Sequence, residues 1–72
     1  MEKNEQNDFL LSLGKKLQEI RKSRSLSQEK VSLYAEINKN YLCDLEKGRR
    51  NPTIKVLYKL AKFYGVDLKD LF

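Results

Sequence analysis

The sequence contains no histidine and a single cysteine, and these absences exclude several kinds of functional site. Cys43 cannot form a disulfide within the chain, and one thiolate cannot build a metal cluster. Without histidine the chain lacks the side chain that proteins use most often as acid–base group and metal ligand. We therefore expect no metal and no cofactor. We also expect no enzyme, because the remaining carboxylates and lysines form no nucleophile–base arrangement.

Long apolar runs are also missing. No stretch approaches the roughly 18 apolar residues of a membrane span, and the charged segment 1–8 has no signal-peptide core. These absences predict a cytoplasmic protein without a membrane partner. The 72 residues, 40% hydrophobic and 35% charged, are typical of one soluble globular domain with a modest core. Self-association is a common way for so small a domain to bury more surface.

The positive charge is concentrated in one segment. Residues 37–62 contain seven basic residues against two acids, Asp44 and Glu46, which accounts for the whole net charge of +5. Such a concentration favours one positive face suited to phosphate groups. A lysine-rich surface that only keeps the protein soluble has the same composition.

The spacing of apolar residues predicts an all-α fold of five helices. We expect a flexible N-terminal tail over residues 1–8 and one domain over residues 9–72. In the first helix, one face at 3.6 residues per turn carries Phe9, Leu10, Leu13, Leu17 and Ile20. The other helices are expected at Gln28–Ala35, Lys39–Lys47, Ile54–Tyr64 and Leu68–Phe72.

Local signals mark the helix boundaries and the buried faces. The expected N-caps are Ser27, Asn38, Thr53 and Asp67, and the expected left-handed C-caps are Gly48 and Gly65. The residues expected to point inward from the second helix are Val31, Tyr34 and Ala35. The helix Ile54–Tyr64 is apolar apart from three lysines, which places it at the centre of the core.

Residues 27–52 form the most informative unit: a capped helix, a turn of about three residues, a second helix and a basic loop. Helices joined this closely cross steeply. The first can then rest on the sugar–phosphate backbone while the second enters the major groove, about 12 Å wide. The second helix fits this arrangement because one arc is apolar and the opposite arc is polar.

The chain resembles the Xre family of helix-turn-helix regulators, which includes phage repressors and Cro proteins. The resemblance lies in LGKKLQEIR (13–21), LSQEKV (26–31), NKNYL (38–42), LEKGRRNPT (45–53), LA (60–61) and GV (65–66). Residues 41–52 are most similar to the controller proteins of restriction-modification systems, which are dimeric. The resemblance implies a phage-repressor-like domain that regulates transcription as a homodimer on a near-palindromic operator.

Three residues depart from the family pattern. Glu36 and Ser25 stand where the family usually has glycine, and Ser32 stands where it usually has alanine. Glu36 is strained if the turn still needs a positive φ.

The residues expected to contact base edges are Lys39, Asn40, Cys43 and Asp44. Lysine can donate to guanine, asparagine can pair with adenine, and aspartate can accept from cytosine. Without the resemblance, these side chains would be an ordinary solvated helix face. Asp44 either reads a base or pairs with Lys47 or Arg49, and Cys43 is either a contact to a thymine methyl or a partly buried, inert thiol.

The residues expected to contact DNA phosphates are Gln28, Tyr41, Lys47, Arg49, Arg50 and Asn51. The resemblance implies that Gln28 braces the backbone, and the helix N-terminus at that position favours phosphate. The alternative for the two arginines is that they only keep the loop soluble. The resemblance also implies a structural ion pair between Arg21 and Glu46.

The residues expected at the dimer interface are Tyr64, Leu68, Leu71 and Phe72. Large apolar groups at a chain end need a cover, either the body of the domain or a second copy. A dimer would place two recognition helices about 34 Å apart on one face of double-stranded DNA. The bound dimer would then regulate transcription by blocking RNA polymerase or by contacting it. We expect no small-molecule effector.

An antitoxin or another protein-interaction module with the same fold is the alternative function. Binding to duplex DNA distinguishes the two, because each neutralised phosphate steepens the log–log salt dependence by about 0.9.

Overall fold

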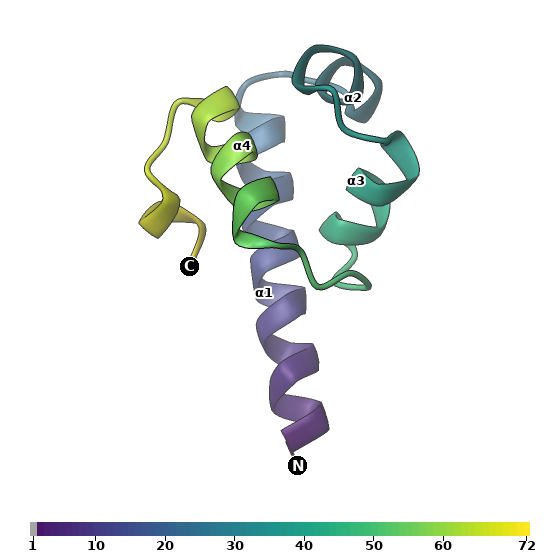
Figure 1. Cartoon of the computed structure of the whole chain (residues 1–72), viewed down its shortest axis with the longest axis vertical. Helices are drawn as coiled ribbons and strands as arrows, with labels where there is room; N and C mark the ends of the chain where they lie inside the picture. The colour runs from purple at the N-terminus through teal and green to yellow at the C-terminus, as the bar shows by residue number, and fades with distance from the viewer. Residues whose placement is uncertain (1) are drawn as a thin grey trace.

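The computed structural model describes residues 2–72, with side chains from Asp8 onward. Within this range it contains α-helices, one short 3₁₀ helix and no strands (Figure 1). The α-helices are α1 (Glu2–Ser23), α2 (Gln28–Ala35), α3 (Lys39–Glu46) and α4 (Ile54–Tyr64), and the 3₁₀ helix is η1 (Leu68–Leu71). The all-α prediction is confirmed. The count of five α-helices is not, because the last segment is the 3₁₀ helix.

Both ends of the chain differ from the predicted boundaries. α1 begins at Glu2, whereas the apolar stripe predicted a helix only from Phe9. The flexible tail predicted for residues 1–8 stays a prediction, because the side chains of residues 1–7 lie outside the described part. At the other end, η1 has four residues, a length typical of 3₁₀ geometry. Among the described residues, none of the helices combines the length and the hydropathy that a membrane span requires.

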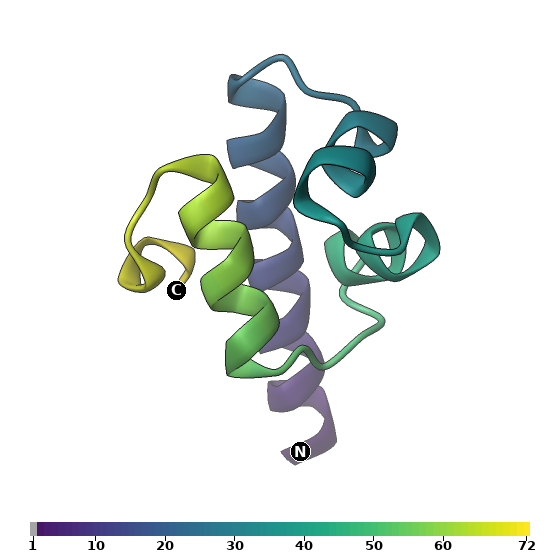
Figure 2. The same ribbon diagram turned by 45° about the horizontal axis from the view of Figure 1, so that its top comes forward.

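α1 runs along the length of the molecule, with α4 and η1 on one side and α2 and α3 on the other (Figures 1 and 2). The core forms where these elements meet. Leu17 of α1, Leu42 of α3 and Leu60 of α4 are fully buried there. α4 therefore lies in the core as predicted. The inward orientation predicted for Tyr34 is wrong, because this side chain is 65% exposed.

Each α-helix ends with one residue in the left-handed conformation. These residues are Ser25 (φ 55°), Glu36 (φ 56°), Gly48 (φ 74°) and Gly65 (φ 75°). After each of them, the next amide donates to a carbonyl five residues earlier, as in a Schellman motif. The N-caps of α2, α3 and α4 are also as predicted, since the side chains of Ser27, Asn38 and Thr53 accept from backbone amides.

Gly14 allows α1 to approach the end of α3 closely. A Cβ atom at this position would lie 2.5 Å from the Leu45 carbonyl oxygen and 2.6 Å from that of Glu46. Any larger residue would force the helices apart. A glycine that is a weakness for the helix itself is therefore required by the packing of α1 on the helix-turn-helix unit.

Candidate nucleic-acid interface

Two of the residues that depart from the family pattern lie at the junction of α2 and the following turn: Ser32 in α2 and Glu36 in the turn. Glu36 adopts φ 56° and ψ 52°, so the turn does need a positive φ, and a residue with a Cβ bears the strain. The Ser32 hydroxyl donates to the Ile37 carbonyl at 2.6 Å, and the Ile37 amide donates to the Ser32 carbonyl at 3.1 Å. Ser32 therefore joins α2 to the turn in a way that alanine could not.

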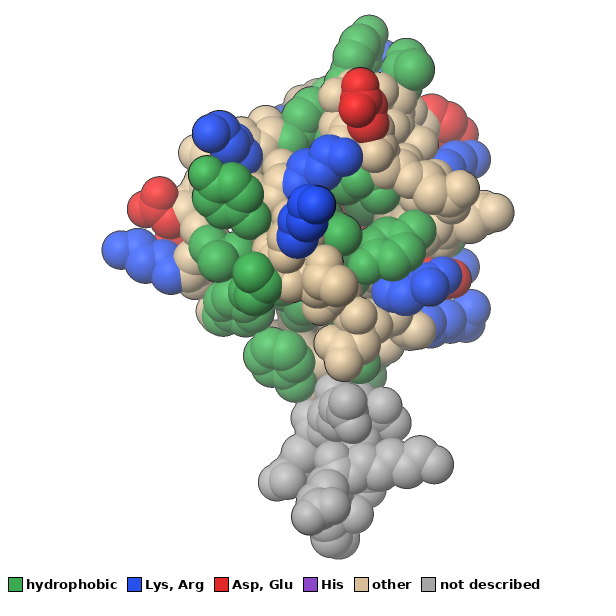
Figure 3. All heavy atoms as spheres, viewed as in Figure 1, with side chains coloured by type: hydrophobic (Ala, Val, Ile, Leu, Met, Phe, Trp, Pro, Cys, Tyr) green, Lys and Arg blue, Asp and Glu red, His purple; other side chains and the backbone are tan. Residues whose placement is uncertain are grey.

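α3 has two chemically different sides. Leu42 and Leu45 are buried on the inner side. On the outer side Lys39, Asn40 and Lys47 are exposed, while Cys43 and Asp44 are half-buried. None of these outer residues packs into the core, so the polar side of α3 is accessible to a partner. Lys and Arg side chains also gather at the edge of the molecule over α3 and the following loop (Figure 3).

Lys39, the first residue of α3, is paired in the free protein. Its Nζ donates to Glu29 Oε2 of α2 at 3.0 Å, and both side chains are largely exposed. The hydrogen bond from Lys39 lowers the pKa of the Glu29 carboxyl. Such an exposed pair is weak, so Lys39 is free to exchange this partner for another.

Asp44 pairs with Arg50, not with Lys47 or Arg49 as the alternative predicted. Arg50 Nη2 lies 3.7 Å from Asp44 Oδ2, and its guanidinium carbon lies 4.7 Å from the centroid of the Tyr41 ring. The arginine thus covers two residues of α3 at once. The carboxylate of Asp44 faces a positive group, which offsets its negative charge on this side of α3.

The basic loop after α3 starts from a fixed turn. The Gly48 amide donates to the Leu45 carbonyl, and the Arg49 amide donates to the Asp44 carbonyl at 2.9 Å. A Cβ at Gly48 would also lie 2.9 Å from Leu11 of α1, so both the φ and the packing require glycine. The turn directs the exposed residues Arg49, Arg50 and Asn51 away from the core beside α3.

Arg21 and Glu46 form the ion pair that the resemblance implies, and both are buried. Arg21 donates from Nε to Glu46 Oε2 at 2.7 Å and from Nη2 to Oε1 at 3.0 Å. The hydrogen bond to Glu46 raises the pKa of Arg21. The side-chain Nε2 of Gln28 donates to Glu46 Oε1 at 3.0 Å, and the phosphate contact predicted for Gln28 stays a prediction. The network joins α1, α2 and α3 at the start of α2.

The sequence pattern described as Helix-turn-helix matches residues 17–71. The chain belongs to the helix-turn-helix family. The matched range includes α2, the turn and α3, and it extends to the end of η1. The family resemblance predicted from the sequence is confirmed.

Helix-turn-helix relatives of similar length include restriction-modification controllers. The chain is 38% identical over 66 residues to control protein C.BamHI of Bacillus amyloliquefaciens, covering 90% of this chain and 82% of the relative. It is 33% identical over 67 residues to control protein C.MunI of a Mycoplasma species, covering 92% and 90%. The crystal structure of the restriction-modification controller protein C.AhdI from Aeromonas hydrophila matches with a TM-score of 0.86 and 29% identity, covering 90% and 98%.

The four residues predicted at a dimer interface do not share one environment in this helix-turn-helix protein. Tyr64 and Leu71 are buried in the chain's own core, so the structure assigns them to folding. Leu68 is half-buried, and Phe72 is 58% exposed. The burial of Tyr64 also raises the pKa of its hydroxyl to about 12.

Three exposed apolar residues, Phe9, Ile54 and Tyr58, were not predicted from the sequence. Phe9 stacks on Phe72 with ring centroids 6.0 Å apart, and both rings remain about half exposed. On α4, Ile54 and Tyr58 are 62% and 55% exposed. Their separation of four residues puts Ile54 and Tyr58 on one side of the helix, outside the buried arc of Leu57, Leu60, Ala61 and Tyr64. This spacing was the sequence signal that could have identified them as exposed.

Proposed function

We propose that this helix-turn-helix transcriptional regulator binds a near-palindromic operator in double-stranded DNA as a homodimer. The single observation that supports this most directly is the exposed polar side of α3, bordered by the basic loop of Arg49, Arg50 and Asn51. A helix with such a side fits the major groove, where base edges offer distinct patterns of donors and acceptors.

The base contacts are assigned to the side of α3 that faces away from the core. Lys39 and Asn40 stand in its first turn, where a recognition helix enters the groove. Cys43 lies one turn further along α3, and we assign it a contact to a thymine methyl. Asp44 reads a cytosine only if Arg50 moves from its carboxylate to a phosphate.

The phosphate contacts are assigned to groups on either side of α3. Arg49, Arg50 and Asn51 flank its C-terminal end, with Tyr41 and Lys47 beside them. On the other side, the first amides of α2 at Gln28 can meet a phosphate even though the Gln28 side chain binds Glu46. We assign Arg21 and Glu46 to holding these two helices at a fixed angle.

The dimer interface is proposed at exposed apolar groups of α1, α4 and the C-terminal segment. Phe72 and Leu68 are kept from the predicted set, and Phe9 and Ile54 are added because a single chain leaves them exposed. Covering these groups by a second copy would remove apolar surface from water, at about 25 cal/mol for each Å².

Further aspects of the proposal follow from the relatives. Two of them are named control proteins and one structure is a restriction-modification controller, so we propose that this chain regulates such a system. Its dimer would act in the cytoplasm by blocking RNA polymerase or by contacting it beside a promoter. We propose no enzymatic activity and no small-molecule effector.

Selection of genomic fragments by the purified protein tests this function. The expected result is enrichment of one near-palindromic sequence whose half-sites are one helical turn apart, about 10 base pairs. Binding should weaken steeply with salt, with a log–log slope of about −0.9 for each phosphate contacted. If no duplex binds with such a salt dependence, the fold serves protein interaction instead, as in an antitoxin.

A further inference from the structure

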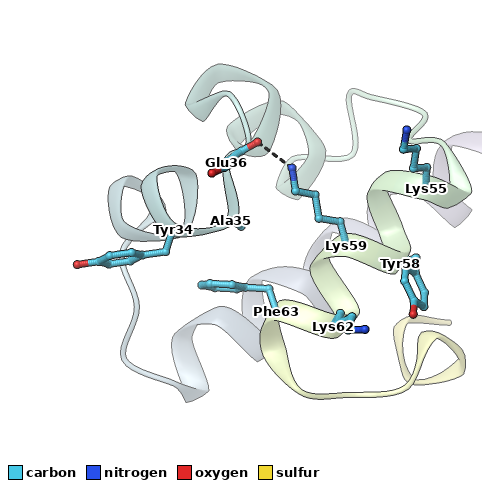
Figure 4. A pocket seen from close by; sticks show the side chains of 8 residues that line it. All are labelled: Tyr34, Ala35, Glu36, Lys55, Tyr58, Lys59, Lys62 and Phe63. Carbon is cyan, nitrogen blue, oxygen red and sulfur yellow. Dashed lines mark hydrogen bonds between the residues drawn. The ribbon is translucent and has the colours of Figure 1, made fainter.

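A second surface, separate from α3, is a groove of about 540 Å³ between α2 and α4. Its apolar lining includes Tyr34 and Ala35 from α2 and Tyr58 and Phe63 from α4. The Phe63 ring points from α4 toward α2 (Figure 4). None of the residues proposed to contact DNA lines this groove, so a ligand here and an operator on α3 could be bound together.

The two walls are tied together at one end. Lys59 Nζ donates to the Glu36 carbonyl at 3.0 Å, and its side chain crosses from α4 to the end of α2 (Figure 4). This contact spans 23 positions of the chain and fixes α4 against the turn of the helix-turn-helix unit. The groove is therefore a formed feature of the fold.

The rim of the groove is positively charged. Lys55, Lys59 and Lys62 line it, against one acid, Glu36. Among the described side chains, none of these three lysines forms a salt bridge. Lys62 Nζ lies 5.7 Å from the centroid of the Tyr58 ring, a contact that supplies no negative charge. The surface thus combines aromatic rings with cations that have no carboxylate partner among the described side chains.

The openness of the groove favours a polypeptide over a small molecule. Tyr34 and Tyr58 are 65% and 55% exposed, so both walls face solvent. Small ligands are usually buried by about 70–90% of their surface, which walls this open do not provide. An amphipathic helix, in contrast, lies in an open groove along its length and keeps its polar side in water.

We propose that the α2–α4 groove binds an acidic amphipathic segment of another protein. Apolar side chains of the segment pack on Tyr34 and Phe63, and its carboxylates face Lys55, Lys59 and Lys62. The groove gives the regulator a protein-binding site on a different face from the one that meets DNA. Nucleic acid is the less favoured occupant, because phosphates would leave the aromatic rings uncovered.

Selection from a library of random peptides, with the immobilised full chain as bait, tests this proposal. Enriched peptides are expected to carry an excess of Asp and Glu around apolar residues spaced three and four apart. The best peptide should bind the Lys62→Glu and Tyr34→Ser variants about tenfold more weakly, as expected for central contacts of an interface. Lys16→Glu, a matched change at an exposed lysine of α1, should bind it like the unaltered chain.

Backbone amide NMR shows where the peptide binds and whether the variants fold. The expected shifts are at Ala35, Lys59 and Phe63. The proposal is overturned if the enriched peptides show no acidic excess, if Lys16→Glu weakens binding as much as Lys62→Glu, or if the shifts lie on α3. It is also overturned if duplex DNA without an operator shifts the groove amides while the acidic peptide does not.

Discussion

The guanidinium of Arg21 and the carboxylate of Glu46 form two parallel hydrogen bonds, 2.7 and 3.0 Å long, between α1 and the last turn of α3. Glu46 is the more deeply buried of the two, with 1% of its side chain exposed. The same carboxylate accepts from Gln28 of α2. The orientation of α3, and so its proposed fit to DNA, depends on this carboxylate as well as on the close packing at Gly14.

Removing one partner should therefore destabilise the fold strongly. Arg21→Ala and Glu46→Ala should each lower the free energy of unfolding by about 3 to 5 kcal/mol, since each leaves a buried charge unpaired. Urea denaturation measures this. The double variant Arg21→Met/Glu46→Leu should lose much less, because it leaves neither charge behind. Losses under about 1 kcal/mol for both single variants would show that solvent reaches the pair.

Glu36→Gly should stabilise the protein by about 0.5 to 1 kcal/mol. A residue with a Cβ in the left-handed conformation costs about 1 to 2 kcal/mol, and glycine avoids this cost. Part of the gain is offset because glycine has a larger conformational entropy in the unfolded chain. Thermal unfolding at neutral pH gives the change. Glu36→Ala is the control, because it removes the same carboxylate and keeps the Cβ, and it should give no gain. An equal gain from both variants would assign the effect to charge.

The free energy of unfolding should fall as the pH rises from about 10 to about 12. Burial raises the pKa of Tyr64 to about 12, while an unfolded tyrosine ionises near pH 10. Between these values the unfolded chain loses the proton and the folded chain keeps it. The free energy of unfolding therefore falls by about 2 to 3 kcal/mol from its value below pH 10. Tyr64→Phe separates this effect from other alkaline titrations. It should reduce the pH dependence and leave neutral stability unchanged or higher, because the hydroxyl has no hydrogen-bond partner within the described chain.

Base contacts and phosphate contacts should respond differently to mutation. Lys39→Ala and Asn40→Ala should each reduce discrimination at one base pair by about 1 to 3 kcal/mol, while Arg50→Ala should weaken binding to all sequences alike. Affinities for the operator, its single-base variants and random duplex DNA measure both effects. If all three variants lose equally on operator and random DNA, the assignment of base reading to the start of α3 is wrong.

The pKa of Glu29 should rise when operator DNA binds. In the free protein the hydrogen bond from Lys39 holds this pKa below its usual range. If Lys39 moves to a base, that bond is lost and the nearby phosphates further favour the protonated carboxyl. NMR titration of the Glu29 side chain, with and without operator, measures the change. The Lys39→Ala variant should show the higher pKa before DNA is added, and a pKa in the complex as low as in the free protein would place Lys39 away from the DNA.

Features determined within a few residues of chain could be predicted without the structure. The caps at Ser27, Asn38 and Thr53 depend on one side chain and an amide three residues later. The polar side of α3 follows from helical periodicity alone. For the same reason Tyr34 was misplaced, since periodicity identifies the side of a helix but not how far a neighbouring helix covers it.

The amino-acid sequence by itself determined the all-α fold, most helix boundaries and the polar arc of α3, because hydrogen bonding and periodicity act locally. Only the tertiary structure decided that Tyr64 and Leu71 are buried, that Asp44 pairs with Arg50, and that Gly14 must have no side chain. These outcomes depend on how segments far apart in the chain approach one another. Local preferences do not encode those distances, which arise only when the whole core packs.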